Sequence, residues 1–258
     1  MSKRTTRWIG AETIRFEETD STNLQAKRLA EEGVPDGTLV VADCQTAGRG
    51  RLGRSFSSPH GDGIFMTVIL RPEVPANQVS CLTLIAALAV HRGIAEAAGV
   101  DCAIKWPNDI ILNGKKVCGI LTEMSMEEHA VRHVVIGIGI NCGNTDFPEE
   151  LKEVATSLFL ETGQQIERED LIWRIWTAFE PLYDSFLKYH DLRELRDSYN
   201  ALLINCDREV EVLDSPEAWK GTARGIDETG ALLVENAARE LVAISTGEVS
   251  VRGVYGYV

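Results

Sequence analysis

The sequence predicts a mixed α/β domain followed by a small all-β barrel. Up to about residue 205, apolar runs typical of buried strands alternate with long segments whose apolar residues recur at helical spacing. From Asp207 onward, short alternating strands are separated by turns, a spacing typical of a barrel of about fifty residues. We therefore expect two domains, residues 1–205 and 206–258.

Composition narrows the class of protein. The 258 residues are 44% hydrophobic and 25% charged, which is enough to build a sizeable core. A formal net charge of -13 disfavours general binding to DNA or to an anionic membrane. No apolar run approaches the length of a membrane span, and no apolar signal segment follows the N-terminus.

The six cysteines are scattered, without a Cys-x-x-Cys pair or the histidine spacing of a zinc site. In a chain of this length, dispersed cysteines within apolar runs are typical of reduced, buried thiols. We expect a cytoplasmic protein with no metal site of its own.

The first elements lead to a charged loop. A strand is predicted around residues 13–16, and a helix begins after Asp20-Ser-Thr-Asn23 and ends near Gly33. Side chains at such a helix start either cap the helix or form a polar pocket for a carbonyl or an anion, and both readings stay open here. A buried strand over residues 38–43 then enters the loop.

This loop, residues 45–54, reads Gln-Thr-Ala-Gly-Arg-Gly-Arg-Leu-Gly-Arg and is called the Gly-Arg loop below. Its three glycines allow close backbone approach to a ligand, and its three arginines supply permanent cations suited to carboxylates and phosphates. A solvated turn is the bland alternative. A nucleic-acid contact is disfavoured because phosphate-backbone binding needs a broad basic face.

The middle of the chain predicts strands, one long helix and a hairpin. Pro72 and Pro75 separate a strand from a helix at about 77–98, which Gly99 ends. Asn113-Gly114 between apolar runs predicts a type I′ hairpin turn. The strands are expected at residues 64–70, 102–106, 110–112, 115–124 and 134–141.

Gly137 and Gly139 alternate on the last of these strands. No third glycine follows at the required spacing and no helix begins there, so this is not a dinucleotide-binding motif. Instead, the glycines leave one face of the strand free for a flat ligand.

The remaining elements are a short helix at 149–155, a long amphipathic helix from about Glu169 with a kink expected at Pro181, and a helix at about 191–201. The expected barrel strands begin at Glu209, Trp219, Ala231, Glu240 and Glu248.

The polar patches indicate a type of chemistry. Cations, amides and glycines gather in the motifs, and there is no Cys-His or Ser-His arrangement for nucleophilic catalysis. Cations without a nucleophile suit a reaction between two anions, such as a carboxylate attacking the α-phosphate of ATP. A carboxylate is already ionised at neutral pH, so the obstacle is charge repulsion, which cations and Mg²⁺ remove.

Four motifs, in this order and spacing, make the chain resemble the biotin protein ligases, also called biotin–[acetyl-CoA-carboxylase] ligases. They are Gln45-x-x-Gly-Arg-Gly-Arg-x-Gly-Arg54, Lys105-Trp-Pro-Asn-Asp109, Lys116-x-x-Gly-Ile-Leu121 and Gly137-x-Gly-Ile-Asn141. Asp20-Ser-Thr-Asn23 and Gly225-Ile-Asp-x-x-Gly-Ala-Leu-Leu-Val-Glu235 also match, so the resemblance covers nearly the whole chain.

The resemblance implies a class II synthetase-like mixed sheet flanked by helices, with an SH3-like C-terminal barrel. It implies that biotin and ATP form biotinyl-5′-AMP and pyrophosphate, after which biotin passes to a lysine of a biotin carboxyl carrier protein or carboxylase domain. ATP with Mg²⁺ and biotin would be substrates, with no tightly bound prosthetic group. The resemblance also suggests a homodimer as one oligomeric form.

Site roles follow from the same resemblance. The catalytic residues would be Arg51, Lys116, Asp109 and Lys105. Biotin would contact Ser21, Thr22, Asn23, Gln45, Arg49, Gly50, Arg51, Lys116, Gly119, Gly137 and Gly139. The nucleotide would contact Arg49, Arg51, Arg54, Phe56, Lys105, Asn108, Lys116 and Asn141.

Two departures from the family matter. About twenty residues precede the Asp20 motif, too few for the N-terminal winged helix of many bacterial members, so we expect a ligase that is not a DNA-binding repressor. Phe56 stands where some relatives have a tryptophan near the adenine.

Two alternatives remain. One is a lipoate–protein ligase, which shares the acyl-adenylate logic. The other is a non-catalytic ligand sensor, which would be expected to lack Arg51 or Lys116, although both are present.

Overall fold

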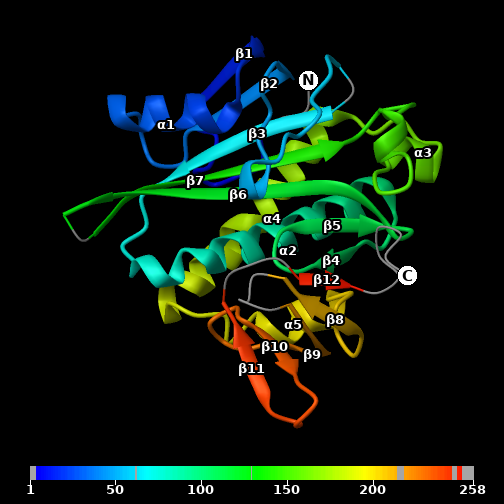
Figure 1. Cartoon of the computed structure of the whole chain (residues 1–258). Helices are drawn as coiled ribbons and strands as arrows, with labels where there is room; N and C mark the ends of the chain where they lie inside the picture. The colour runs from blue at the N-terminus through cyan, green and yellow to red at the C-terminus, as the bar shows by residue number, and fades with distance from the viewer. Residues whose placement is uncertain (1–3, 62, 129, 214–217, 246–248, 252–258) are drawn as a thin grey trace.

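The computed structural model describes residues 4–61, 63–128, 130–213, 218–245 and 249–251 (Figure 1). Its centre is a seven-stranded mixed sheet in the order β1-β2-β3-β7-β6-β5-β4. The strands are β1 (Thr13–Thr19), β2 (Leu39–Gln45), β3 (Gly63–Leu70), β4 (Ala103–Lys105), β5 (Asp109–Leu112), β6 (Lys115–Glu127) and β7 (Ala130–Asn141). Among the described residues of this sheet, β1 and β2 pair in parallel and the other neighbouring strands are antiparallel.

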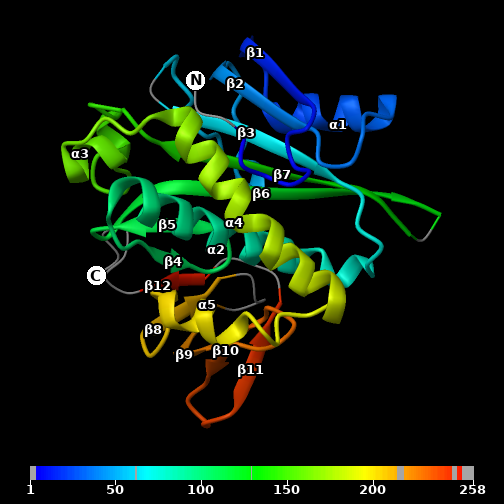
Figure 2. The ribbon, with the colours of Figure 1, turned by 180° about the vertical axis from the view of Figure 1, so that it is seen from behind.

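Helices cover both faces of this sheet (Figures 1 and 2). Helix α1 (Thr22–Glu32) lies on one face, where Ala26 and Ala30 form a small apolar cluster with alternate strand residues such as Val40. Helices α2 (Ser80–Ala98) and α4 (Arg168–Tyr189) pack together on the other face and belong to the main core. Since strand side chains alternate, one sheet supplies both clusters.

The second sheet has the antiparallel order β11-β10-β9-β8-β12. Its strands are β8 (Glu209–Val212), β9 (Trp219–Ile226), β10 (Leu232–Glu235), β11 (Leu241–Ile244) and β12 (Val249–Val251). Val210 and Val212 belong to the same apolar cluster as α2, and the indole N–H of Trp106 donates to the carbonyl of Gly230 at 3.0 Å. The C-terminal sheet is therefore packed firmly against the rest of the molecule.

Several local predictions are confirmed. Gly33 and Gly99 end α1 and α2 in the left-handed conformation. Asn113 and Gly114 both have positive φ, +50° and +82°, as a type I′ turn requires. All six cysteines are free, in agreement with the predicted reduced thiols.

Other boundaries were wrong. The expected helix at 149–155 is only a 3₁₀ turn, η3 (Glu149–Leu151), before the short helix α3 (Leu158–Thr162). The helix expected at 191–201 begins only at Arg196, as α5 (Arg196–Leu202). Before it, the Leu192 N–H donates to the Glu228 carbonyl, and this tertiary bond replaces a helical one. The helix expected at 77–98 starts with a separate 3₁₀ turn, η2 (Ala76–Gln78).

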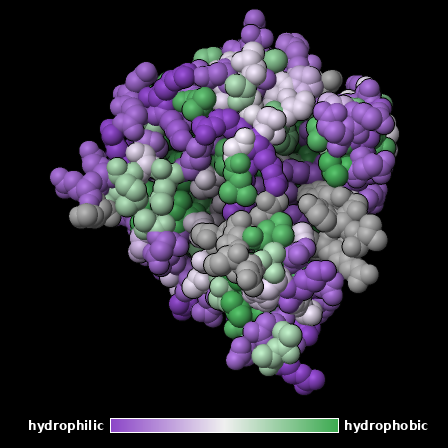
Figure 3. All heavy atoms as spheres, in the orientation of Figure 1, coloured by the Kyte–Doolittle hydropathy of each residue, from purple (hydrophilic) through white to green (hydrophobic). Residues whose placement is uncertain are grey.

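Strand β6 extends three residues beyond the predicted end at Met124, because β7 continues as its antiparallel partner. On the face shown in Figure 3, apolar side chains gather over this outer part of β6, where Met124 and Met126 are each 45% exposed.

The expectation that no apolar run approaches a membrane span was also wrong. Among the described helices, the segment Ala76–Ala98 is long and apolar enough to meet that test. Its most apolar window is 67% buried, between the sheet and α4. Its composition is therefore that of a core helix.

Candidate active site

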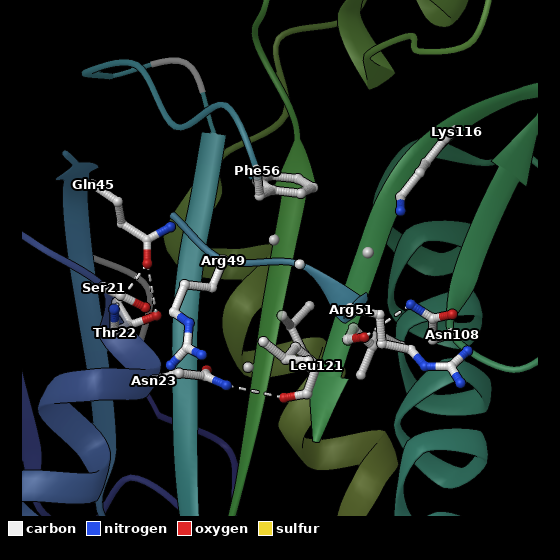
Figure 4. A pocket seen from close by; sticks show the side chains of 16 residues that line it. Ser21, Thr22, Asn23, Gln45, Arg49, Arg51, Phe56, Asn108, Lys116 and Leu121 are labelled. Carbon is white, nitrogen blue, oxygen red and sulfur yellow. Dashed lines mark hydrogen bonds between the residues drawn. The ribbon is translucent and has the colours of Figure 1, made fainter. Parts of the chain in front are cut away.

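Residues of the polar sequence motifs line two adjoining pockets. The inner pocket lies between the start of α1, the end of β2, the Gly-Arg loop and the glycine-bearing parts of β6 and β7 (Figure 4). It is lined by Ser21, Thr22, Asn23, Gln45, Arg49, Gly50, Arg51, Phe56, Asn108, Lys116, Gly119, Ile120, Leu121, Gly137, Ile138 and Gly139. Every residue predicted to contact biotin belongs to this lining.

The outer pocket adjoins the inner one. It is lined by Arg54, Ser55, Phe56, Ser57, Lys105, Asp109, Lys116, Asn141, Phe147, Leu151, Val154, Ala155 and Ser250. Phe56 and Lys116 line both pockets and so stand at their border. The outer pocket encloses about 380 Å³ and the inner one about 40 Å³.

A hydrogen-bond chain organises one wall of the inner pocket. The Gln45 side chain donates to the Ser58 hydroxyl at 2.8 Å, and its oxygen accepts from the backbone N–H of Thr22 at 2.8 Å and from the Thr22 hydroxyl at 3.1 Å. Thr67, fully buried on β3, lies 2.9 Å from the Thr22 hydroxyl and donates to Asn23 Oδ1 at 2.8 Å. The chain holds these polar groups in fixed orientations.

The two readings of the α1 start are thereby resolved. Ser21 is the N-cap residue, but its side chain makes no capping hydrogen bond. The backbone N–H of Thr22, the first helical residue, donates to Gln45 Oε1 instead, at 2.8 Å. Ser21 and Thr22 line the pocket, which agrees with the polar-pocket interpretation.

Asn23 is committed to protein partners. Its amide nitrogen donates to the Leu121 carbonyl at 3.1 Å and to Glu123 Oε2 at 2.9 Å, which uses both hydrogens. Its oxygen accepts from Thr67. Asn23 therefore ties α1 to β6 and β3.

The Gly-Arg loop is a small hairpin. The Gly50 N–H donates to the Arg54 carbonyl at 2.7 Å, and the Phe56 N–H donates to the Gly48 carbonyl at 2.9 Å. Figure 4 shows that Arg49 points toward Asn23 whereas Arg51 lies beside Asn108. The two guanidinium groups therefore flank the inner pocket on opposite sides.

The glycines do not leave open space in this structure. A Cβ built on Gly139 would lie 2.7 Å from the ring of Phe56, and one on Gly119 would lie 3.4 Å from that ring. A Cβ on Gly137 would overlap the amide oxygen of Asn23. The glycines thus allow the Phe56 ring and the Asn23 amide to pack directly on the sheet, a use that sequence spacing did not reveal.

The border between the pockets carries a close ion pair. The ammonium nitrogen of Lys116 lies 2.5 Å from Asp109 Oδ1. Lys105 is paired with Asp109 across β4 and β5. Both residues line the outer pocket. The Lys116 backbone is fixed by hydrogen bonds with the segment after η3: its N–H donates to the Val154 carbonyl and its carbonyl accepts from Thr156.

Several residues of the site were not predicted. Phe147, Leu151, Val154 and Ala155 give the outer pocket an apolar wall, and Ser250 reaches it from β12. A usable signal was the group of apolar residues in the otherwise polar stretch after Asn141. Asn141 lines the outer pocket, but its amide donates to the Thr156 carbonyl at 3.0 Å and so also anchors this stretch.

Glu123 was also missed. Its carboxylate lies 2.5 Å from the Lys27 ammonium and 3.6 Å from the Arg49 guanidinium. Burial alone would favour its protonated form, but bonds from Lys27 and Asn23 outweigh burial and keep the pKa of Glu123 below its usual value. Glu123 is therefore ionised at neutral pH.

The arrangement suits a ligand with a neutral polar head and an anionic end. Hydroxyl and amide groups line one side of the inner pocket, while Arg49, Arg51 and Lys116 supply positive charge. The outer pocket combines cations with an apolar wall, which suits a flat base carrying phosphates. Within the described ranges, no group of three or more His, Cys, Asp or Glu side chains is placed to hold a metal ion.

Comparison with known proteins gives two family matches. Residues 15–141 match the model described as "Biotin/lipoate A/B protein ligase family", and residues 206–252 match "Biotin protein ligase C terminal domain". The second match spans the five strands of the C-terminal sheet.

Relatives with names and structures agree with these matches. The chain is 46% identical over 231 residues to the bifunctional ligase/repressor BirA of Bacillus subtilis, covering 88% of this chain and 70% of that protein. It is 34% identical over 225 residues to the biotin–[acetyl-CoA-carboxylase] ligase of Paracoccus denitrificans, covering 85% and 92%. A structure of biotin protein ligase from Aquifex aeolicus in complex with biotin and ATP superposes with a TM-score of 0.80 at 30% identity, covering 94% and 99%.

Proposed function

This chain belongs to the biotin/lipoate A/B protein ligase family, and from that premise we propose that it is a biotin protein ligase. It activates biotin with ATP, forming biotinyl-5′-AMP and pyrophosphate, and transfers biotin to a lysine of a carrier domain. The observation that carries this function is the meeting of the two pockets at Lys116, between groups that suit an acyl ligand and groups that suit a nucleotide.

The inner pocket takes the ureido head of biotin. Its cavity of about 40 Å³ is too small for the whole ligand, so the Phe56 ring that rests on Gly139 has to move when biotin enters. The ureido head carries donors and an acceptor, which the side chains of Ser21, Thr22 and Gln45 and the backbone of Gly119 match. The Gln45 oxygen is already oriented by two bonds from Thr22, so binding orders few further groups. Arg49, Gly50, Gly137 and Gly139 complete this pocket, and Asn23 supports it through its protein partners.

The outer pocket takes ATP. Arg54, Lys105 and Lys116 supply charge for the phosphates, and Asn108 and Asn141 supply amides near them. Phe147 and Leu151 offer an apolar surface to the purine, with Phe56 on the other side at the border. Mg²⁺ would arrive bound to ATP. Asp109 is the acidic residue in the described lining of the outer pocket, and it would be the carboxylate nearest to that ion.

The first reaction needs positive charge more than a base. The biotin carboxylate attacks the α-phosphate and pyrophosphate leaves, and no proton has to be removed from the carboxylate. Arg51 and Lys116 reduce the repulsion between the two anions and stabilise charge on the transition state. Arg51 comes from the Gly-Arg loop and Lys116 from β6, two segments that are far apart in the sequence.

The second reaction needs a neutral amine. A lysine amine has a pKa of about 10.4, so at neutral pH it arrives protonated. Asp109, in the outer pocket beside Lys116, orients the incoming ammonium group and accepts its proton, and the neutral amine nitrogen then attacks the acyl carbon. AMP is the leaving group.

The carrier domain of a carboxylase is the protein partner, and biotin is favoured over lipoate because the named relatives are biotin ligases.

We also propose that residues 1–205 and 206–258 are separate domains, supported by two sheets that share no strand. A cytoplasmic protein without DNA or membrane partners is supported by the net charge of -13. Homodimerisation stays a prediction, which sedimentation with and without biotin tests.

The decisive experiment is ATP–pyrophosphate exchange with purified protein and Mg²⁺, with biotin and lipoate as parallel substrates. We expect exchange that depends on biotin. Exchange with lipoate alone would contradict the assignment of biotin as the substrate. No exchange with either compound would contradict the proposed enzymatic function.

A further inference from the structure

Glu123 links three parts of the inner pocket. One carboxylate oxygen lies 2.5 Å from the Lys27 ammonium and 3.6 Å from the Arg49 guanidinium. The other accepts a hydrogen bond from Asn23 at 2.9 Å. Through these contacts Glu123, on β6, meets both α1 and the Gly-Arg loop.

The environment of Glu123 differs from that of Glu127, another glutamate on the same strand. The Glu123 side chain is 20% exposed, whereas Glu127 is 68% exposed and lies 3.8 Å from Arg132. Placing a carboxylate at partial burial is unfavourable unless partners compensate. In the part of the chain that the structure describes, its side chain contacts Lys27 and Asn23 of α1 and Arg49 of the inner pocket, so its position is connected with the site.

We propose that Glu123 is a positioning residue, which holds the Arg49 guanidinium at the inner pocket before biotin binds and fixes the orientation of Asn23. This inference rests on the proposed function of the inner pocket. Glu123 does not line that pocket, so it acts through the residues that do.

The physical reason is preorganisation. The Arg49 side chain is 45% exposed and belongs to a short hairpin, so it loses side-chain entropy when a ligand immobilises it. An ion pair formed beforehand removes part of that loss from the binding step. The Glu123 carboxylate supplies the pair without entering the space where the ligand lies.

Lys27 gives the proposal a second, opposite prediction. It shares the carboxylate oxygen with Arg49 and lies closer to it. Removing the Lys27 charge leaves Arg49 as the cation beside that oxygen, while Asn23 keeps its bond to the other one. We therefore expect Lys27→Met to hold biotin as tightly as the wild type or more tightly, although a surface-facing ion pair is lost.

The test is biotin affinity measured by calorimetry on the whole protein. Glu123→Gln keeps the size of the side chain and an oxygen for Asn23 but removes the charge. We expect affinity about fivefold weaker, since a charge-assisted contact to a partly exposed arginine is lost. The matched control is Glu127→Gln, on the same strand, which should leave affinity unchanged.

A double-mutant cycle separates positioning from general destabilisation. In an Arg49→Gln background, Glu123→Gln should weaken biotin binding much less than in the wild type, because its effect passes through Arg49. Equal effects in both backgrounds, or an unchanged affinity for Glu123→Gln alone, would overturn the proposal. If the wild-type protein itself failed to bind biotin, the proposed function would fail instead.

Discussion

The ammonium nitrogen of Lys116 and a carboxylate oxygen of Asp109 lie 2.5 Å apart at the border of the two pockets. Their backbones are not opposite each other, since Asp109 on β5 pairs with Gly119 and Lys116 on β6 pairs with Ile111. The two side chains therefore meet diagonally across neighbouring strands, which pair antiparallel through the turn at Asn113-Gly114. In the proposed mechanism the lysine serves the first reaction and the carboxylate the second, and the ion pair holds each of them in place. An anionic adenylate would attract Lys116 and leave Asp109 available to the incoming amine.

Substitutions of this pair should separate the two reactions. Lys116→Met removes a cation from the transition state and should slow biotinyl-adenylate formation about 10²–10³-fold, the range found for losing one stabilising donor. Asp109→Asn keeps the site volume but removes the base, so transfer from preformed biotinyl-5′-AMP should slow more than adenylate formation. Pyrophosphate exchange measures the first step, and single-turnover biotinylation of a carrier domain measures the second. Equal losses in both steps for Asp109→Asn would contradict the assigned division.

Arg51→Ala should loosen the adenylate. The guanidinium lies on the Asn108 side of the inner pocket (Figure 4), and in the proposed mechanism it contacts the anionic product. Adenylate formation should slow, and release of biotinyl-5′-AMP into solution should rise about tenfold, as expected for one lost charged contact. The measurement is retention of labelled adenylate after rapid gel filtration. Unchanged exchange together with unchanged retention would show that the loop has another role.

Phe56 should govern access between the pockets, because its ring rests on Gly139 at the border of both. Phe56→Ala should weaken binding of biotinyl-5′-AMP by about tenfold through loss of aromatic contact area. Gly139→Ala should displace the ring, since the new Cβ would lie 2.7 Å from it. The effects of the two substitutions on affinity, measured by calorimetry, should not add in the double variant. Additive effects would mean that the ring and Gly139 act independently.

Glu180 should stabilise the N-terminal segment in a pH-dependent way. Its side chain is 2% exposed and accepts backbone N–H bonds from Arg7, Trp8 and Ile9 at 2.8–3.0 Å. Burial would raise its pKa, but these donors outweigh burial, so the pKa of folded Glu180 lies below its ordinary value. A lowered folded pKa means that the stabilisation is complete above the unfolded pKa of about 4.3 and is lost as pH falls through the folded pKa.

Glu180→Gln should therefore lower the free energy of unfolding by about 2 kcal/mol at pH 7, a typical value for lost bonds to a charged group. Below pH 4 the difference from wild type should shrink. Urea unfolding at a series of pH values measures this, with the exposed Glu127→Gln as control. A difference that stayed constant from pH 7 to pH 3 would show that the charge of Glu180 is not the cause.

The local sequence was a good guide wherever structure depends on nearby residues. Gly99 ends α2 and Asn113-Gly114 turns the hairpin, because these residues tolerate positive φ. The motifs also identified the lining of the inner pocket, since each stands at a strand end or helix start that one sheet brings together. The expected helix at 149–155 failed because that segment bonds to the backbone of Lys116, a residue distant in sequence.

The sequence by itself therefore determined the element order, the turns, the cationic character of the site and the family. Only the tertiary structure decided which side chains occupy the site: Phe56 lies on Gly139, Asn23 lies against Gly137, and Glu123 reaches Arg49. The physical reason is that turns and caps depend on the φ and ψ of a few successive residues. Contacts across a sheet depend on strand register and on packing between segments that are far apart in the chain.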